Sequence, residues 1–171
     1  MLNPVTTHKS KVCLGMVNKT KRLFYLPFFD YDNIEDYTKI KLELLQLQQK
    51  YRLSDIFIFS SEHGFNAFSL DKLHYETFKK LCYDSKYLCN DFRRLGLKRG
   101  FLVLRIGKDK VLKEVLFNKG KYKKSLPHLI ALNQFYGVEI KYNISEFDKN
   151  LDLRIYAYRS EKHGFLKVRE L

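Results

Sequence analysis

The sequence LFYLPFFDYDN at positions 23–33 is an apolar run of strand type that ends in two carboxylates, Asp30 and Asp32. Because side chains alternate along a strand, these two carboxylates share one face of it. Two like charges at the end of a buried strand have two explanations. Either Asp32 or Asn33 caps a following helix, or the carboxylates hold a divalent cation whose charge offsets their repulsion.

Beyond this stretch, strand-like and helix-like segments follow each other along the chain. Short apolar runs bounded by turn residues predict strands, and apolar spacings of three and four residues predict helices. The expected strands are residues 11–18, 22–32, 55–61, 64–70, 101–107, 111–117, 138–144 and 152–160, and the expected helices are residues 33–51, 71–85 and 125–137. No linker or low-complexity segment separates them. The pattern therefore predicts an α+β fold with a single domain over residues 1–171.

The helix expected at 33–51 has the clearest periodicity. Asn33 is the candidate N-cap, and Glu35 and Asp36 suit the first turn. The residues predicted to form one buried stripe are Tyr37, Ile40, Leu44, Leu47 and Tyr51. We therefore interpret this stripe as core.

Composition limits the class of protein. The 171 residues are 45% hydrophobic and 15% aromatic, which is enough to bury one sizeable core. No run of 18 apolar residues is present, and residues 1–12 lack the apolar region of a secretory signal, so we expect a cytoplasmic protein with no membrane partner. The three cysteines, Cys13, Cys82 and Cys89, form no C-x-x-C motif, and their odd number argues against a disulfide framework. We expect buried thiols, because nothing in the spacing requires a zinc site with a partner such as His74.

Positive charge is concentrated in one segment. The chain has a net charge of +13, and residues 93–124 contain twelve Lys or Arg against two acidic residues, a net charge of +10. A face that only confers solubility usually mixes signs, so this segment favours a nucleic-acid partner. The candidate nucleic-acid-binding residues are Arg93, Arg94, Lys98, Arg99, Lys121, Lys123 and Lys124.

Four motifs carry residues suited to phosphate chemistry. Asp30 and Asp32 come first, and the strand turn with Ser60, Ser61 and Gly64 follows, where backbone N–H groups could approach an anion. Asp91 is a lone carboxylate in a loop beside the basic segment. The last motif is a strand with basic residues at its end, Arg105, Lys108 and Lys110. Together they offer carboxylates for metals and cations for phosphates, as phosphoryl or nucleotidyl transfer requires.

In order and spacing these motifs resemble those of the archaeo-eukaryotic primase superfamily of primases and primase-polymerases. The likeness covers roughly residues 23–110: a D-x-D strand, a serine and glycine turn, a single aspartate, and an R…K strand about 14 residues further on. It implies a core related to the RNA-recognition-motif fold, with an antiparallel or mixed sheet and flanking helices. It also implies two Mg²⁺ or Mn²⁺ ions on Asp30, Asp32 and Asp91 and template-directed nucleotide addition in replication. The implied partners are nucleoside triphosphates, single-stranded or template DNA or RNA, and a helicase or other replication chain.

The chain departs from the family at one position. The family's second motif ends in a G-x-H pattern whose histidine contacts the triphosphate, whereas this chain has Gly64-Phe65-Asn66. Asn66 can donate a hydrogen bond but carries no charge, and His63 in the same turn is an alternative contact. Two other functions stay open: a non-catalytic nucleic-acid-binding replication factor, and a metal-dependent nuclease.

Overall fold

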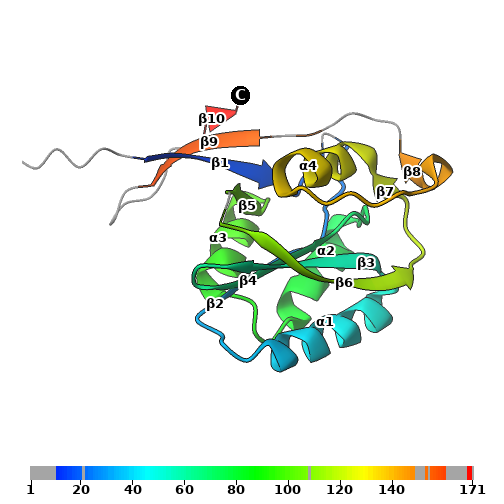
Figure 1. The fold of residues 1–171 in the computed structure, drawn as a ribbon, viewed down its shortest axis with the longest axis horizontal. Coiled ribbons are helices and arrows are strands. Elements are labelled where there is room, and N and C mark those ends of the chain that lie inside the picture. Colours follow the sequence, from blue (N-terminus) through cyan, green and yellow to red (C-terminus); the bar gives the residue numbers. More distant parts are fainter. Residues whose placement is uncertain are drawn as a thin grey trace, which may run out of the picture.

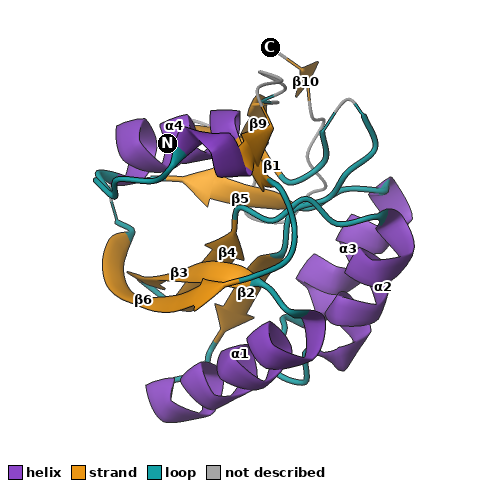
Figure 2. Cartoon of the chain, turned by 90° about the vertical axis from the view of Figure 1, so that its right-hand side faces the viewer, coloured by secondary structure: helices purple, strands orange, loops and turns teal. Residues whose placement is uncertain are grey.

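The computed structural model describes residues 11–20, 22–107, 109–148, 153, 155–160 and 169–170. These residues form helices and antiparallel sheets, which confirms the α+β class. In Figures 1 and 2, one sheet lies in the middle of the molecule, with α1 on one face and α4 and a second sheet over the other. The helices α2 and α3 stand beside the β2 edge of the middle sheet.

The middle sheet contains residues 28–32 of the quoted stretch and has the strand order β2-β4-β3-β6. Its strands are β2 (Phe28–Asp32), β4 (Gly64–Ser69), β3 (Ser54–Ser61) and β6 (Val111–Lys119). Asp30 pairs with Asn66, and Asp32 pairs with Gly64. Because partners in register point to the same side, the Asp30, Asp32 and Asn66 side chains share one face. The strand pair predicted around the turn at residues 62–64 is confirmed.

The second sheet has the order β10-β9-β1-β5. Its strands are β10 (Arg169–Glu170), β9 (Ile155–Ser160), β1 (Lys11–Val17) and β5 (Val103–Ile106). The short strands β7 (Lys124–Ser125) and β8 (Phe147–Asp148) pair separately and in parallel. β5 and β6 are neighbours in sequence but belong to different sheets. The connection at 107–110 therefore crosses from one sheet to the other, which brings both to one site.

The helices are α1 (Tyr37–Tyr51), α2 (Tyr75–Asp84), α3 (Asn90–Arg99) and α4 (Leu126–Tyr136), with a 3₁₀ turn, η1, at Ile144–Glu146. The core stripe predicted on α1 is confirmed. Ile40, Leu44 and Leu47 are buried, and Tyr37 and Tyr51 pack against the core from its margin. From α4, Tyr136 packs on the Phe59 and Phe68 rings and so covers the opposite face of the sheet.

The predicted N-cap of α1 is wrong. Asp36 caps the helix, since its side chain accepts a hydrogen bond from the Thr38 N–H at 3.0 Å. Asn33 instead adopts a left-handed conformation, with φ of 57°, and its N–H donates to the His63 carbonyl. Asn33 therefore turns the chain out of β2, and neither Asp32 nor Asn33 is used as a helix cap.

Three other predicted boundaries are wrong. Residues 22–27 precede β2 without joining its ladder, because Leu23 has a positive φ and Pro27 lacks an N–H donor. Residues 138–144 form no strand. They cross the end of β3, where Tyr142 donates to Asp55 at 2.7 Å and packs on Phe147. Residues 90–99, expected as a charged connection, form α3.

Candidate active site

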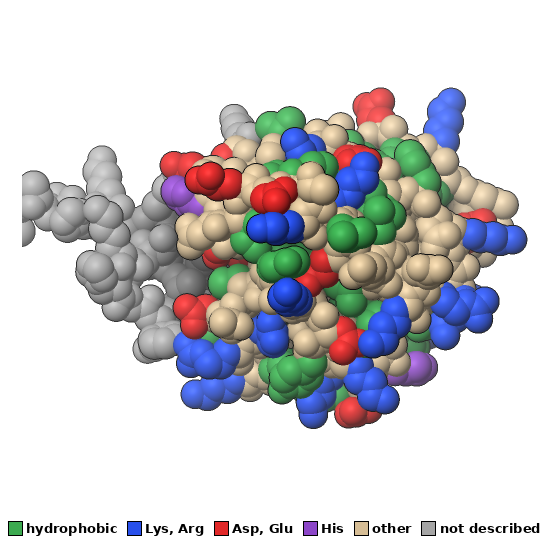
Figure 3. Space-filling model, turned by 90° about the horizontal axis from the view of Figure 1, so that it is seen from below, with side chains coloured by type: hydrophobic (Ala, Val, Ile, Leu, Met, Phe, Trp, Pro, Cys, Tyr) green, Lys and Arg blue, Asp and Glu red, His purple; other side chains and the backbone are tan. Residues whose placement is uncertain are grey.

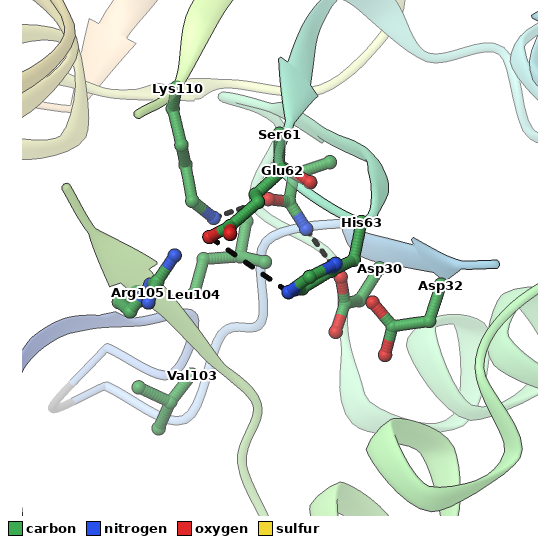
Figure 4. A pocket seen from close by; sticks show the side chains of 10 residues that line it. Asp30, Asp32, Ser61, Glu62, His63, Val103, Leu104, Arg105 and Lys110 are labelled. Carbon is green, nitrogen blue, oxygen red and sulfur yellow. Dashed lines mark hydrogen bonds and ion pairs between the residues drawn. The ribbon is translucent and has the colours of Figure 1, made fainter. Parts of the chain in front are cut away.

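A pocket of about 280 Å³ opens where the end of β2, the β3–β4 turn and β5 meet (Figure 4). The predicted site residues that line it are Asp30, Asp32, Ser61, His63, Asn66, Arg105 and Lys110. Glu62, Val103 and Leu104 complete the lining and were not predicted. Figure 4 shows Asp30 and Asp32 on one strand end, with Arg105 and Lys110 across the pocket from them.

The turn closes tightly on β2 because residue 64 is glycine. Gly64 pairs with Asp32 and has a φ of 154°, a backbone conformation that residues other than glycine rarely adopt. A Cβ atom at this position would collide with the backbone carbonyl oxygen of Tyr31. Gly64 therefore lets the turn reach the two aspartates.

Asn66 lies between a buried cation, Lys110, and a partly buried carboxylate, Asp30. Its amide nitrogen donates to Asp30 Oδ1 at 2.5 Å, and its amide oxygen accepts a hydrogen bond from Lys110 Nζ. Asn66 is 4% exposed and Lys110 is 9% exposed, so both interactions are sheltered from water. The residue at the family's histidine position thus uses both ends of its amide within the protein.

Burial is the largest influence on the pKa values of Asp30 and Lys110. Burial, followed by repulsion from Asp32, raises the pKa of Asp30 to about 6, although Lys110 and Asn66 oppose the shift. Burial likewise lowers the pKa of Lys110 to about 8 against the attraction of Asp30. Both groups are therefore easier to neutralise than exposed residues of their type, and an added cation near Asp30 would favour its ionised form.

Arg105 comes from β5, on the other side of the pocket. Its guanidinium forms an ion pair with Asp109 at 2.6 Å and stays 44% exposed. An exposed guanidinium with five donors retains capacity for a further anion. Lys108, predicted beside it, lies outside the described residues.

The two serines of the turn lie on opposite faces. Ser61 lines the pocket, whereas the Ser60 hydroxyl donates to the Val111 carbonyl at 3.3 Å on the other side of β3. Ser60 therefore lies away from the two aspartates. His63 is exposed at the rim of the pocket and lies 3.9 Å from the Glu62 carboxylate.

Asp91 is near this end of β2 in the fold, but its side chain is not part of the pocket lining. It lies in the first turn of α3, 77% exposed, and pairs with Arg94 at 3.2 Å. The helix is held to the site strand by the Cys89 N–H, which donates to the Asp30 carbonyl at 2.8 Å. Within the described part of the chain, no group of three or more His, Cys, Asp or Glu side chains is arranged to hold a metal ion. The structure thus brings two of the three predicted carboxylates together.

The predicted nucleic-acid-binding residues do not form one surface. Arg94, Lys98 and Arg99 lie on α3, whereas Lys121 and Lys123 follow β6 at the opposite edge of the sheet (Figures 1 and 2). Two of the predicted residues use their side chains for contacts within the protein. Lys124 is 5% exposed and pairs with Glu146 at 2.6 Å, so the prediction of a nucleic-acid contact is wrong for it. Arg93 donates to the Ser85 and Leu88 carbonyls and so holds the loop before α3.

Comparisons with protein-family models, with curated proteins and with solved structures return no match to this chain. In the described residues, no helix combines the length and apolarity needed to cross a bilayer. Cys82 and Cys89 are free thiols. Cys82 is buried, as expected, whereas Cys89 is only partly buried, and the Cys13 side chain lies outside what the structure describes.

Proposed function

We propose that this chain is a metal-dependent nucleotidyltransferase of the primase type that acts on a nucleic-acid template in replication. The observation that carries the proposal is the pocket itself. Two neighbouring carboxylates on β2 face two cations, Arg105 and Lys110, which come from a different part of the fold. Carboxylates suit hard divalent cations and basic side chains suit phosphates, so one pocket offers both halves of a metal–triphosphate ligand.

The donor set fits Mg²⁺ or Mn²⁺. Asp30 and Asp32 supply carboxylate oxygens only, and their mutual repulsion raises the pKa of Asp30 after the larger effect of burial. A divalent cation between them would remove this repulsion. When bound, two such cations would activate the 3′-hydroxyl of a growing strand and neutralise the departing pyrophosphate. Asp91 would join the ligands only by leaving Arg94.

The other residues of the pocket have separate tasks in this proposal. Arg105 and Lys110 neutralise phosphate charge, and Asn66 fixes the position of the Asp30 carboxylate. Ser61 lies beside the space where phosphates would lie, and His63 stands at its rim. Because the Asn66 amide oxygen already accepts from Lys110, Asn66 positions protein groups and does not replace the family's histidine as a triphosphate contact.

The finer assignment of the fold is part of the same proposal. The sheet β2-β4-β3-β6 is antiparallel and four-stranded, and α1 covers the face opposite the site. Such a sheet with helices packed on it is compatible with the RNA-recognition-motif-related core that the resemblance implies. A helicase or other replication chain would be the protein partner in this proposal.

A second candidate function is a non-catalytic nucleic-acid-binding replication factor. The observation that favours it is Asn66, a neutral amide at the family's histidine position with both ends engaged inside the protein. Such a protein would keep the basic surfaces and bind nucleic acid without turnover.

Primer extension with Mn²⁺ and nucleoside triphosphates tests the proposal. We expect wild type to extend a primed template, and Asp30→Asn to abolish extension while the fold is kept. Glu76→Gln, an exposed carboxylate on α2, is the matched control and should extend normally. Binding without extension would replace the proposal with the non-catalytic function, and shortening of the strand would replace it with a nuclease. Asp91→Asn decides whether the third aspartate participates. Loss of extension in this variant would mean that extension needs the Asp91 carboxylate.

A further inference from the structure

Phe117 is an unusually exposed aromatic residue on β6. Its side chain is 73% exposed, the highest value among the large hydrophobic residues of the described chain. Val111, on the same strand, is 61% exposed. β6 is the outer strand of its sheet in the described order, so no neighbouring strand covers it. Single exposed hydrophobic residues are common on protein surfaces, so the significance of Phe117 depends on the residues around it.

Cations surround the same end of β6. Lys119 ends the strand, Lys121 and Lys123 follow it, and the Lys121 N–H donates to the Arg52 carbonyl at 3.0 Å, which brings Arg52 to the same place. We call Arg52, Lys119, Lys121 and Lys123 the β6 basic cluster. All four side chains are exposed, and none has an ion pair with another residue that the structure describes.

The acidic residues beside this cluster are already engaged within the protein. Glu146 pairs with the buried Lys124, and Asp148 pairs with the buried Lys72, each at 2.6 Å. The buried Asp55 accepts hydrogen bonds from the Asn118 N–H and the Tyr142 hydroxyl. The outward charge of the cluster is therefore positive. Figure 3 shows that basic, acidic and hydrophobic side chains are mixed on the face seen from below.

β6 also leads directly into the pocket. Lys110, which lines the pocket, immediately precedes Val111, the first residue of the strand. The eight residues from Lys110 to Phe117 span about 23 Å of extended chain. A flexible polyanion lying along this edge could therefore reach from the β6 basic cluster to the pocket.

We infer that the β6 edge is a docking surface for single-stranded nucleic acid, with Phe117 as the platform on which a base stacks. The cluster binds the phosphates around that base, and the strand continues toward Lys110. An aromatic platform flanked by cations is how proteins hold single strands without reading their sequence. A purely apolar protein partner would not require four exposed cations at the same end of β6 as the aromatic ring. The inference rests on the proposed action on nucleic acid, but not on catalysis.

Tryptophan fluorescence provides a direct test, because the chain contains no tryptophan. Phe117→Trp places a single reporter on β6, and Leu42→Trp places one at a comparably exposed position, 57%, on α1. The probe is an oligothymidylate of about 12 nucleotides, added without metal or triphosphate. We expect stacking to quench the emission of Phe117→Trp and leave that of Leu42→Trp unchanged at saturation.

Affinity gives the second readout. Phe117→Ala should weaken binding at least about fivefold, the lower bound for loss of one stacked base, and Leu42→Ala should not. Unchanged emission from Phe117→Trp at saturation, or an unchanged affinity of Phe117→Ala, would overturn the docking surface. A different use of the surface would also overturn it. If sedimentation showed that the wild type is a dimer and that Phe117→Ala is a monomer with full oligonucleotide affinity, the surface would join two copies of the chain. If the strand binds as expected while no variant or wild type extends a primer, the docking surface stands and the proposed catalysis fails.

Discussion

Replacing Asp30 by asparagine should stabilise the protein at neutral pH, although it removes a residue of the proposed catalytic site. The ionised Asp30 carboxylate is partly buried, lies beside Asp32, and is joined to Lys110 through the Asn66 amide. Its pKa is about 6 against an ordinary 3.8. At 1.36 kcal/mol per pKa unit, keeping it ionised costs the fold up to about 3 kcal/mol. The asparagine oxygen can still accept from Asn66.

The sign of the pH dependence follows from these two pKa values. Between about pH 4 and pH 6, the folded protein holds a proton on Asp30 that the unfolded chain has released, so the wild type loses stability as pH rises through this window. Lys110 loses the attraction of Asp30 in the variant, which offsets part of the gain. We therefore expect Asp30→Asn to be more stable by about 1–3 kcal/mol at pH 7.5 and to approach the wild type near pH 4.

Urea unfolding followed by circular dichroism at several pH values measures this difference. Asp91→Asn is the matched control, since that carboxylate is 77% exposed, and it should change stability by less than about 0.5 kcal/mol. Added Mn²⁺ should then stabilise the wild type, by about 1.4 kcal/mol at ten times the dissociation constant, and not Asp30→Asn. The reasoning is refuted if Asp30→Asn is less stable than the wild type at pH 7.5, or if the difference does not vary with pH.

Three further substitutions test other parts of the structure. Asn66→Ala should destabilise the fold by about 3–5 kcal/mol in urea unfolding, because it removes hydrogen bonds to two charged groups, Asp30 and Lys110. The exposed control Asn90→Ala should change the stability by less than about 0.5 kcal/mol. Equal destabilisation by the two substitutions would contradict the bridging role of Asn66. Gly64→Ala should cost about 2–4 kcal/mol in the same assay, since its Cβ would collide with the Tyr31 carbonyl, and a neutral result would mean that the turn moves freely. Replacing the three lysines of the β6 basic cluster by alanine should reduce the slope of log affinity for single strands against log salt by about 2, at about 0.7 per phosphate contact; an unchanged slope would place the phosphates elsewhere.

Local periodicity was sufficient for the elements that fill the core. The α1 stripe and the β3–β4 hairpin could be predicted because their apolar spacing matches the helix and strand repeats. The shared face of Asp30 and Asp32 follows from the same alternation. Their meeting with Arg105 and Lys110 was expected only through the family resemblance, since no local pattern shows that the connection at 107–110 crosses between sheets.

The wrong boundaries have local causes that the sequence partly shows. α3 was missed because its composition is strongly polar, yet it has an acid in its first turn, Lys98 and Arg99 in its last, and Gly100 at its end in a left-handed conformation. Residues 138–144 alternate as a strand does, but pairing depends on a neighbour that a sequence cannot supply. The burial of Lys124 was hidden for the same reason, because its partner Glu146 is 22 residues away.

The hydrogen-bonded series from Lys110 through Asn66 to Asp30 has a consequence for how the pocket would meet a ligand. Direct contact between the Lys110 ammonium and the Asp30 carboxylate would offset both charges and leave this part of the pocket without a local charge. The interposed amide works as an insulating spacer that holds the opposite charges in place and prevents them from cancelling each other. A ligand that carries a positive charge at one end and a negative charge at the other would fit these separated protein charges better than a ligand with a single charge.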